Sequence, residues 1–308
     1  MRPRQAAAAR RGAIIAALVA SGGFARDAGA QGSPRCAERG YRVATRAAAG
    51  AVFVGANAAL YEYFRRAWWS GERADHFRIN WERDDPFRQA DKFGHALGGY
   101  HLARIGTGLL KNACVSSGKA ALGGALYAVA FQTQIELWDA TQAKYGFSPN
   151  DVLANTAGTL YAVAQEAYPV LQRVKPTFSY SPSAAYRNRG NFPAGAAGVE
   201  LRPSLDYSGQ TYWMSADLDA LLPERVKPLW PALVRLSLGH SITDYVDERS
   251  GAFFKARHRL LVSVDVDAEK LPGNHPAWKF VKRQLSYYHF PAPALQIAPT
   301  VKGIAWYR

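Results

Sequence analysis

The sequence predicts an α+β protein that is mainly α in its first half: a membrane-associated helical bundle, then a Pro- and aromatic-rich segment with short strands and an amphipathic helix. Residues 40–172 are rich in Ala, Gly and Leu, whereas residues 176–308 are rich in Pro and aromatic residues. Pro169 and Pro176 mark the change, because proline interrupts helices and favours extended backbone before it. We therefore expect a helical bundle domain over 40–172 and a mixed α/β region over 176–308.

The overall composition excludes several classes of protein. The chain has 308 residues, of which 48% are apolar and 20% charged, so it is neither disordered nor a polytopic transporter. Its formal net charge is +14. We find no nucleic-acid-binding motif, and we expect the basic surface to meet anionic lipid headgroups instead of nucleic acid. The sequence identifies no protein partner.

Residues 1–30 have the three parts of a secretory signal peptide. Four arginines precede a short apolar run over 12–20, which is too short to span a bilayer at ~20 residues. The stretch Ala28-Gly29-Ala30 then supplies a small-x-small cleavage site. Cleavage removes five Arg and one Asp and leaves a charge of about +10. We expect export to the periplasm and association with the inner or outer membrane; an uncleaved anchor is the alternative.

The sequence contains two cysteines, Cys36 and Cys114. In an oxidising compartment they could pair and connect the segment after the signal peptide to the helical half. Two free thiols are the alternative, since the sequence does not give their geometry.

Four helices are expected in the first half. They cover about 44–69, 91–110, 119–142 and 149–171. The last has a well-marked start, because Ser148 can accept a hydrogen bond from the amide of Asp151 and Pro149 occupies the first helical position.

Small residues are frequent on these helices, as in Gly98-Gly99 and Gly123-Gly124. Their spacing allows close helix packing of the kind that membrane helices use. Polar residues such as Arg104 and Gln132 interrupt the apolar runs. A compact bundle that is partly embedded in a membrane, or lies on one, therefore fits better than four membrane crossings.

The second half shows strand-like alternation in three runs, over 210–222, 233–242 and 260–267. Between 277 and 290 the pattern changes to that of a helix with an apolar face containing Trp278 and basic residues elsewhere. This is typical of an amphipathic helix at a membrane interface; a surface helix packed on a core is the alternative.

One set of polar residues in the helical half could carry chemistry. Its members are Asp91, His95, Glu136, Asp139, Asp151 and Asn155. They form pairs three or four residues apart, so each pair shares one helix face. If the second and third helices are antiparallel, the start of one lies beside the end of the next. We therefore expect these side chains to converge at one end of the bundle.

Carboxylates and an imidazole together are typical ligands of a divalent metal, here His95, Glu136, Asp139 and Asp151. The same groups could act as a general acid and base, with pKa values shifted by burial. The alternative is a hydrogen-bonded network that closes the end of the bundle. The sequence contains no HExxH motif, complete Cys/His set or Gly-rich phosphate loop to decide between them.

At these residues the chain resembles a known family. The blocks DKFGHALGGY (91–100), ELWDA (136–140) and GFSPNDVLANTAG (146–158) are similar to the YfiM-like family of predicted periplasmic lipoproteins, domain of unknown function 2279. More distantly they resemble the VanZ-like membrane proteins. The resemblance implies an envelope location and a helical, membrane-associated core, and it implies no activity. Unlike a lipoprotein, this sequence places no cysteine in a lipobox.

The function that we expect is that of an uncharacterised cell-envelope protein with a structural or binding role. The first alternative is an envelope hydrolase, metal-dependent or not, that acts on lipid or cell-wall material. The second is a soluble periplasmic binding module without membrane contact. Catalytic residues stay unassigned among the six polar candidates.

Overall fold

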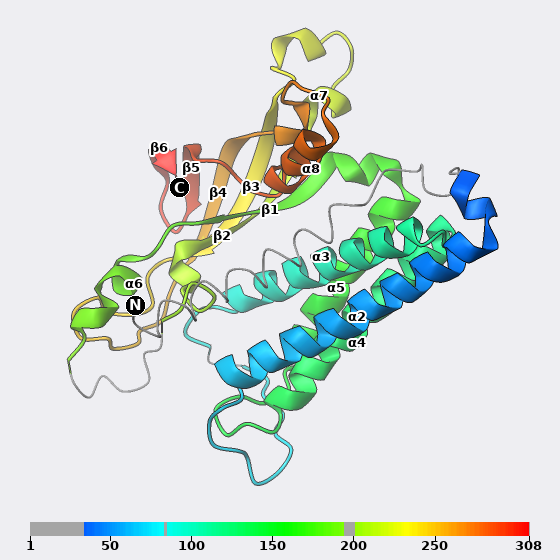
Figure 1. Cartoon of the computed structure of the whole chain (residues 1–308). Coiled ribbons are helices and arrows are strands. Elements are labelled where there is room, and N and C mark those ends of the chain that lie inside the picture. The colour runs from blue at the N-terminus through cyan, green and yellow to red at the C-terminus, as the bar shows by residue number, and fades with distance from the viewer. Residues whose placement is uncertain (1–33, 83–84, 194–200, 308) are drawn as a thin grey trace, which may run out of the picture. The chain divides into compact units, whose positions relative to one another are not determined.

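The computed structural model describes residues 34–82, 85–193 and 201–307 (Figure 1). The predicted signal peptide lies outside the described residues. The chain divides into two compact units. The helical unit contains the chain up to Trp81 together with His95–Tyr168, and the sheet unit contains Glu82–Gly94 together with Pro169–Arg308. Helices in one unit and an antiparallel sheet in the other confirm the predicted α+β class.

The helical unit consists of four long helices whose bounds lie close to the predicted ones. These are α2 (Arg39–Ala67), α3 (Ala90–Asn112), α4 (Ser117–Asp139) and α5 (Pro149–Ala167). The first five residues of α3 group with the sheet unit. At the start of α5 the Ser148 hydroxyl accepts a hydrogen bond from the Asp151 amide, at 3.2 Å. The predicted N-cap is therefore confirmed.

Glycines set the spacing between these helices. A Cβ atom on Gly158 of α5 would lie 1.8 Å from the Ala96 carbonyl oxygen of α3, so no side chain fits there. On α4, a Cβ atom on Gly124 would lie 2.5 Å from the Thr107 amide nitrogen. The backbones of α3, α4 and α5 therefore approach each other as closely as in membrane helix pairs.

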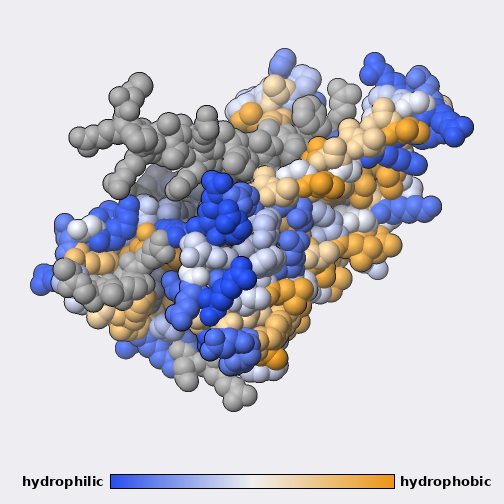
Figure 2. Space-filling view, turned by 60° about the horizontal axis from the view of Figure 1, so that its bottom comes forward, coloured by the Kyte–Doolittle hydropathy of each residue, from blue (hydrophilic) through white to orange (hydrophobic). Residues whose placement is uncertain are grey.

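The outer surface of the helical unit is strongly apolar. Leu122 and Leu126 of α4 are 60% and 62% exposed, and Leu153 and Leu160 of α5 are 70% and 60% exposed. On the face drawn in Figure 2, hydrophobic side chains form bands between hydrophilic ones. Within the described ranges, only α2 is long and apolar enough to cross a membrane by length and composition, and 6% of its most apolar window is buried.

A disulfide joins Cys36 to Cys114, with their Cα atoms 5.7 Å apart. It connects the 3₁₀ turn Pro34–Ala37 to the loop between α3 and α4. The pairing that the sequence left open is therefore formed, as expected of a protein in an oxidising compartment.

The sheet unit is built on a six-stranded antiparallel meander whose strands are neighbours in chain order (Figure 1). The strands are β1 (Val174–Tyr180), β2 (Gln210–Ala216), β3 (Val234–Ile242), β4 (His258–Val266), β5 (Ala292–Ala298) and β6 (Lys302–Tyr307). Each of the three predicted alternating runs overlaps one of them. Only the β5–β6 connection is a short loop; the other connections are longer.

Short helices connect the strands. They are α6 (Ala184–Asn188), α7 (Leu218–Leu221) and α8 (Pro276–Leu285), with 3₁₀ turns between them. The amphipathic helix that the sequence predicts is α8. Its Trp278 and Val281 are 36% and 39% exposed, whereas Lys282 is 6% exposed and donates to the Gly273 carbonyl at 3.0 Å.

Candidate functional site

Three helices of the helical unit position the polar residues singled out from the sequence. His95 lies near the start of α3, Glu136 and Asp139 lie in the last turn of α4, and Asp151 and Asn155 lie in the first turns of α5. The α4–α5 connection spans only residues 140–148, so the end of α4 and the start of α5 are close. His95 meets both of them.

The imidazole of His95 is the centre of the cluster. Its Nε2 atom lies 3.5 Å from Asp151 Oδ1, and its Nδ1 atom lies 3.9 Å from Glu136 Oε1 and 3.1 Å from Asn155 Oδ1. Glu136 and Asp151 have side chains that are 1% and 8% exposed, whereas that of His95 is 28% exposed. Four of the six predicted residues are therefore together, and the imidazole is accessible to solvent.

The hydrogen bonds around Gln132 determine which nitrogen of His95 carries the proton. Gln132 Nε2 donates to the His95 carbonyl oxygen at 3.2 Å, which fixes the orientation of this amide. The same amide donates to Asn155 Oδ1, so the oxygen of Asn155 faces both Gln132 and His95. Since that oxygen is an acceptor, Nδ1 of His95 must be the donor. In the neutral ring, Nε2 then presents a lone pair to Asp151.

Asp139 lies beside this group and is held by a tryptophan. Trp69 Nε1 donates to Asp139 Oδ1 at 2.6 Å, and the Trp69 ring stacks on Trp138 with centroids 5.5 Å apart. Burial raises the pKa of Asp139 to about 6; the Trp69 bond and His95 lower it, and the negative charge of Asp151 raises it. Asp139 is therefore the group of the cluster that changes charge just below neutral pH.

Asp91 precedes His95 by one turn of the continuous helix α3, so the two share a face. Asp91 nevertheless groups with the sheet unit, whereas His95 belongs to the helical unit. Asp91 Oδ2 is 2.8 Å from Lys92 Nζ, while its buried Oδ1 has no hydrogen-bond partner among the residues that the structure describes.

The donor set fits a divalent transition metal. A histidine that binds metal through Nε2 commonly donates its Nδ1–H to an oxygen, as His95 does to Asn155. Two ligands at about 2.1 Å from a tetrahedral ion are roughly 3.4 Å apart. The 3.5 Å between His95 Nε2 and Asp151 Oδ1 is close to this value. It is also longer than a good N–H···O hydrogen bond.

Two residues of the cluster were missed as site residues by the sequence reasoning. Gln132 was treated only as a polar interruption of an apolar helix, and Trp69 only as the last residue of the first expected helix. The spacing could have identified Gln132, because it lies four residues before Glu136 and thus on the same face of α4. No sequence signal indicated Trp69, whose bond to Asp139 joins residues 70 positions apart.

His101 is a further histidine of α3. Burial lowers the pKa of His101 to about 4, with a smaller effect from Arg104, so its ring is neutral at physiological pH.

Comparison with known proteins finds one family. Residues 81–167 match the family model described as predicted periplasmic lipoprotein (DUF2279). No curated protein and no solved structure matches the chain. The matched stretch covers α3, α4 and α5 and includes all six predicted site residues, and the predicted resemblance is confirmed. The more distant likeness to VanZ-like proteins stays a prediction.

The family description names a periplasmic, lipid-anchored protein, so the predicted export and membrane association are confirmed. In this sequence both cysteines are joined in the disulfide, and neither is available to carry a lipid. In residues 81–167 this chain thus carries the sequence pattern of the predicted periplasmic lipoproteins, on the helices that hold the His95 cluster.

Proposed function

We propose that the helical unit binds a divalent cation as part of a membrane-associated envelope protein, with His95 and Asp151 as ligands. The carrying observation is that the Nδ1–H of His95 is used by Asn155 while Nε2 faces the Asp151 carboxylate at 3.5 Å. A cation between the neutral imidazole and the carboxylate accounts for this arrangement.

The competing arrangement is an ion pair in which His95 itself is protonated and contacts Asp151. A metal ion and a proton satisfy the same geometry, so metal content decides between them.

We also propose a helical domain over 40–172 and a mixed domain over 176–308.

The test is metal analysis of the exported, purified chain after dialysis against metal-free buffer. We expect close to one equivalent of Zn²⁺, Mn²⁺ or a similar ion in the wild type and loss of it in His95→Ala. The matched control is His76→Ala, which removes an exposed histidine of the same unit. Metal-free wild type that also fails to take up added Zn²⁺ or Mn²⁺ contradicts the proposal and favours the ion pair.

A second candidate, a metal-dependent envelope hydrolase acting on lipid or cell-wall material, is favoured by Asp139. A carboxyl group whose pKa is raised to about 6 is suited to accept a proton from water near neutral pH. Its test uses the metal-loaded protein with phospholipid and peptidoglycan substrates. Hydrolysis that is lost in Asp139→Asn while bound metal is retained supports it; inactive wild type leaves the binding role.

A further inference from the structure

On the sheet of the sheet unit, the covered face carries many polar side chains beside a small apolar cluster of Trp213, Leu261 and Ala294, whereas the open face is apolar. Along β3, Arg235, Ser237 and Ser241 are at most 2% exposed, whereas Leu236 and Leu238 between them are 38% and 59% exposed. An antiparallel sheet with one face in water normally has the opposite pattern. The exposed apolar side chains therefore indicate that something other than water contacts the open face.

The open apolar face extends over four strands. Leu238 pairs with Met214 of β2 and with Val262 of β4, and Leu236 pairs with Val264. The large apolar side chains on it that are 37% or more exposed are Met214, Leu236, Leu238, Leu260, Val264, Leu295 and Ile297. They form one continuous surface, because cross-strand neighbours on one face lie next to each other.

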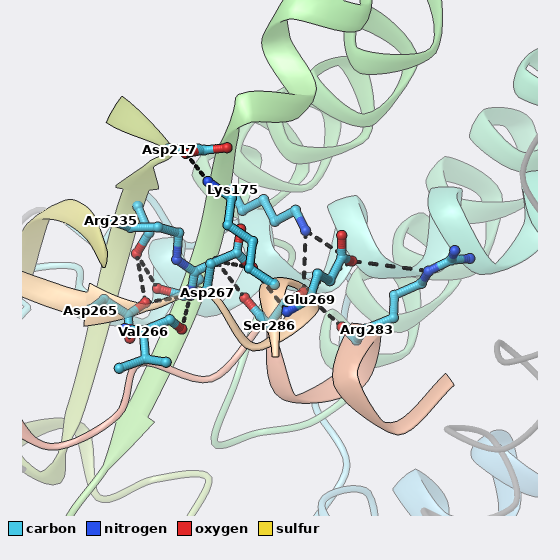
Figure 3. A network of polar contacts seen from close by, with 12 residues as sticks. Lys175, Asp217, Arg235, Asp265, Val266, Asp267, Glu269, Arg283 and Ser286 are labelled. Carbon is cyan, nitrogen blue, oxygen red and sulfur yellow. Dashed lines mark hydrogen bonds and ion pairs between the residues drawn. The ribbon is translucent and has the colours of Figure 1, made fainter. Parts of the chain in front are cut away.

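On the covered face, polar groups of neighbouring strands hydrogen-bond one another. The Ser215 hydroxyl lies 2.8 Å from those of Thr177 and Ser237, so three strands share one row of hydroxyl groups. Arg235 pairs with Asp265 and donates to the Ser286 carbonyl at 2.9 Å (Figure 3). Side chains turned outward are apolar, as in sheets that contact hydrocarbon.

Basic side chains flank one end of this face. Lys255, Arg257 and Lys302 are exposed where β4 and β6 begin. They outnumber the exposed acids of the β3–β4 connection, Asp244 and Glu248, and the latter accepts a hydrogen bond from Asn188. Such an excess of positive charge is complementary to anionic headgroups at the edge of an apolar surface.

We propose that the open face of the β2–β5 sheet lies against the acyl chains of a membrane, with the basic strand ends at anionic headgroups. Membrane association is confirmed for this chain at the level of the family, and neither cysteine is free to carry a lipid anchor. An exposed apolar protein surface is one way in which the chain can attach without a lipid. This proposal is independent of cation binding by the helical unit.

The test places a polarity-sensitive fluorophore on the open face of the full-length protein. Because the disulfide occupies both native cysteines, the new thiol in Leu238→Cys is the single labelling site. The labelled protein is mixed with vesicles of phosphatidylethanolamine and phosphatidylglycerol. We expect a blue shift on vesicle binding and several-fold stronger quenching by a lipid-borne spin label than at the control site. That control is Leu229→Cys, whose native side chain is 81% exposed and lies outside the sheet.

Four outcomes overturn the proposal. A label that iodide still quenches in the presence of vesicles places the face in water. A blue shift that needs no vesicles but rises with protein concentration assigns the face to a second copy of the chain. A blue shift independent of both assigns it to another part of the same chain. Equal quenching at Leu238→Cys and Leu229→Cys shows that the membrane does not contact the sheet in preference to other surfaces. If Leu238→Cys misfolds, Leu295→Cys repeats the measurement on β5.

Discussion

The two units both bury polar groups and expose apolar ones, but they differ in how the buried charges are balanced. In the sheet unit, buried Arg235 pairs with Asp265 and the partly buried Lys175 lies 3.0 Å from Glu269 (Figure 3). The buried Lys282 donates to backbone carbonyls instead. In the helical unit, three carboxylates from α4 and α5 converge on a single imidazole. A balanced network is complete without a ligand, whereas an acidic excess calls for a cation. The difference separates a structural network from a candidate site.

The largest expected effect comes from breaking the balanced network. In Asp265→Asn the guanidinium of Arg235, 1% exposed, loses its close ion-pair partner inside the sheet unit and keeps only Asp267, at 4.0 Å. Removing one partner of a buried pair costs about 3–5 kcal/mol of stability, because the other charge stays buried. Urea unfolding of the full chain measures it.

The control for this variant is Lys227→Ala, which breaks the exposed Lys227–Glu224 pair and is expected to change stability by less than about 1 kcal/mol. If both variants cost the same, the Arg235 pair is not the structural centre of the sheet unit.

The second prediction concerns the unbalanced cluster. Adding Zn²⁺ or Mn²⁺ at about one hundred times its dissociation constant should stabilise the wild type by roughly 2.7 kcal/mol. Asp151→Asn should lose most of this gain, because it removes the carboxylate that faces His95 Nε2. Thermal unfolding with and without the ion measures the difference. An equal metal-induced shift in Asp151→Asn and wild type would place the ion elsewhere.

Much of the fold followed from composition and alternation, whereas the face that the sheet buries did not. The Ala-, Gly- and Leu-rich runs indicated four helices, and Ser148 marked the start of α5. Alternation along 260–267 predicted a strand equally well, but alternation is symmetric: it does not tell which face is buried. That Ser263 is covered and Val264 is exposed depends on neighbouring strands and on their surroundings.

That the candidate side chains lie close together could be predicted from the sequence, whereas the hydrogen bonds between them could not. Residues four apart share a helix face, and a short α4–α5 loop brings Glu136 close to Asp151, so both follow from the sequence. The contact of Trp69 with Asp139 depends on how α2 ends relative to α4, which no local pattern encodes. The Cys36–Cys114 bond likewise depends on a Cα separation of 5.7 Å, which is known only from the fold.

A third prediction concerns how the stability contributed by Asp139 depends on pH. The folded pKa of Asp139, about 6, is raised from its ordinary value of 3.8 by burial. Stability from this group is therefore fully present below pH 3.8 and is lost as pH rises through 6. Asp139→Asn should remove that dependence and stabilise the metal-free protein above pH 7 by about 1–2 kcal/mol.

Urea unfolding in chelator between pH 4 and pH 8 measures this slope, and Asp75→Asn, an exposed aspartate of the same unit, serves as its control. A slope that is the same in Asp139→Asn and the wild type would mean that Asp139 carries no excess burial cost.

The smallest expected effect tests whether the row of hydroxyl groups in the sheet unit is a continuous network. Ser215 is 0% exposed, and its hydroxyl joins those of Thr177 and Ser237 and reaches Asp265 Oδ2 at 3.3 Å. Ser215→Ala removes the middle member and leaves two buried hydroxyl groups with one partner fewer, at a cost of about 1–2 kcal/mol.

Double-mutant cycles with Ser237→Ala decide between a network and isolated bonds. In a network the two substitutions together cost less than the sum of their separate effects, since the second removes a bond that is already broken. Strict additivity would reduce the covered face to a set of independent contacts, and the contrast with the helical unit would then rest on the Arg235–Asp265 pair alone.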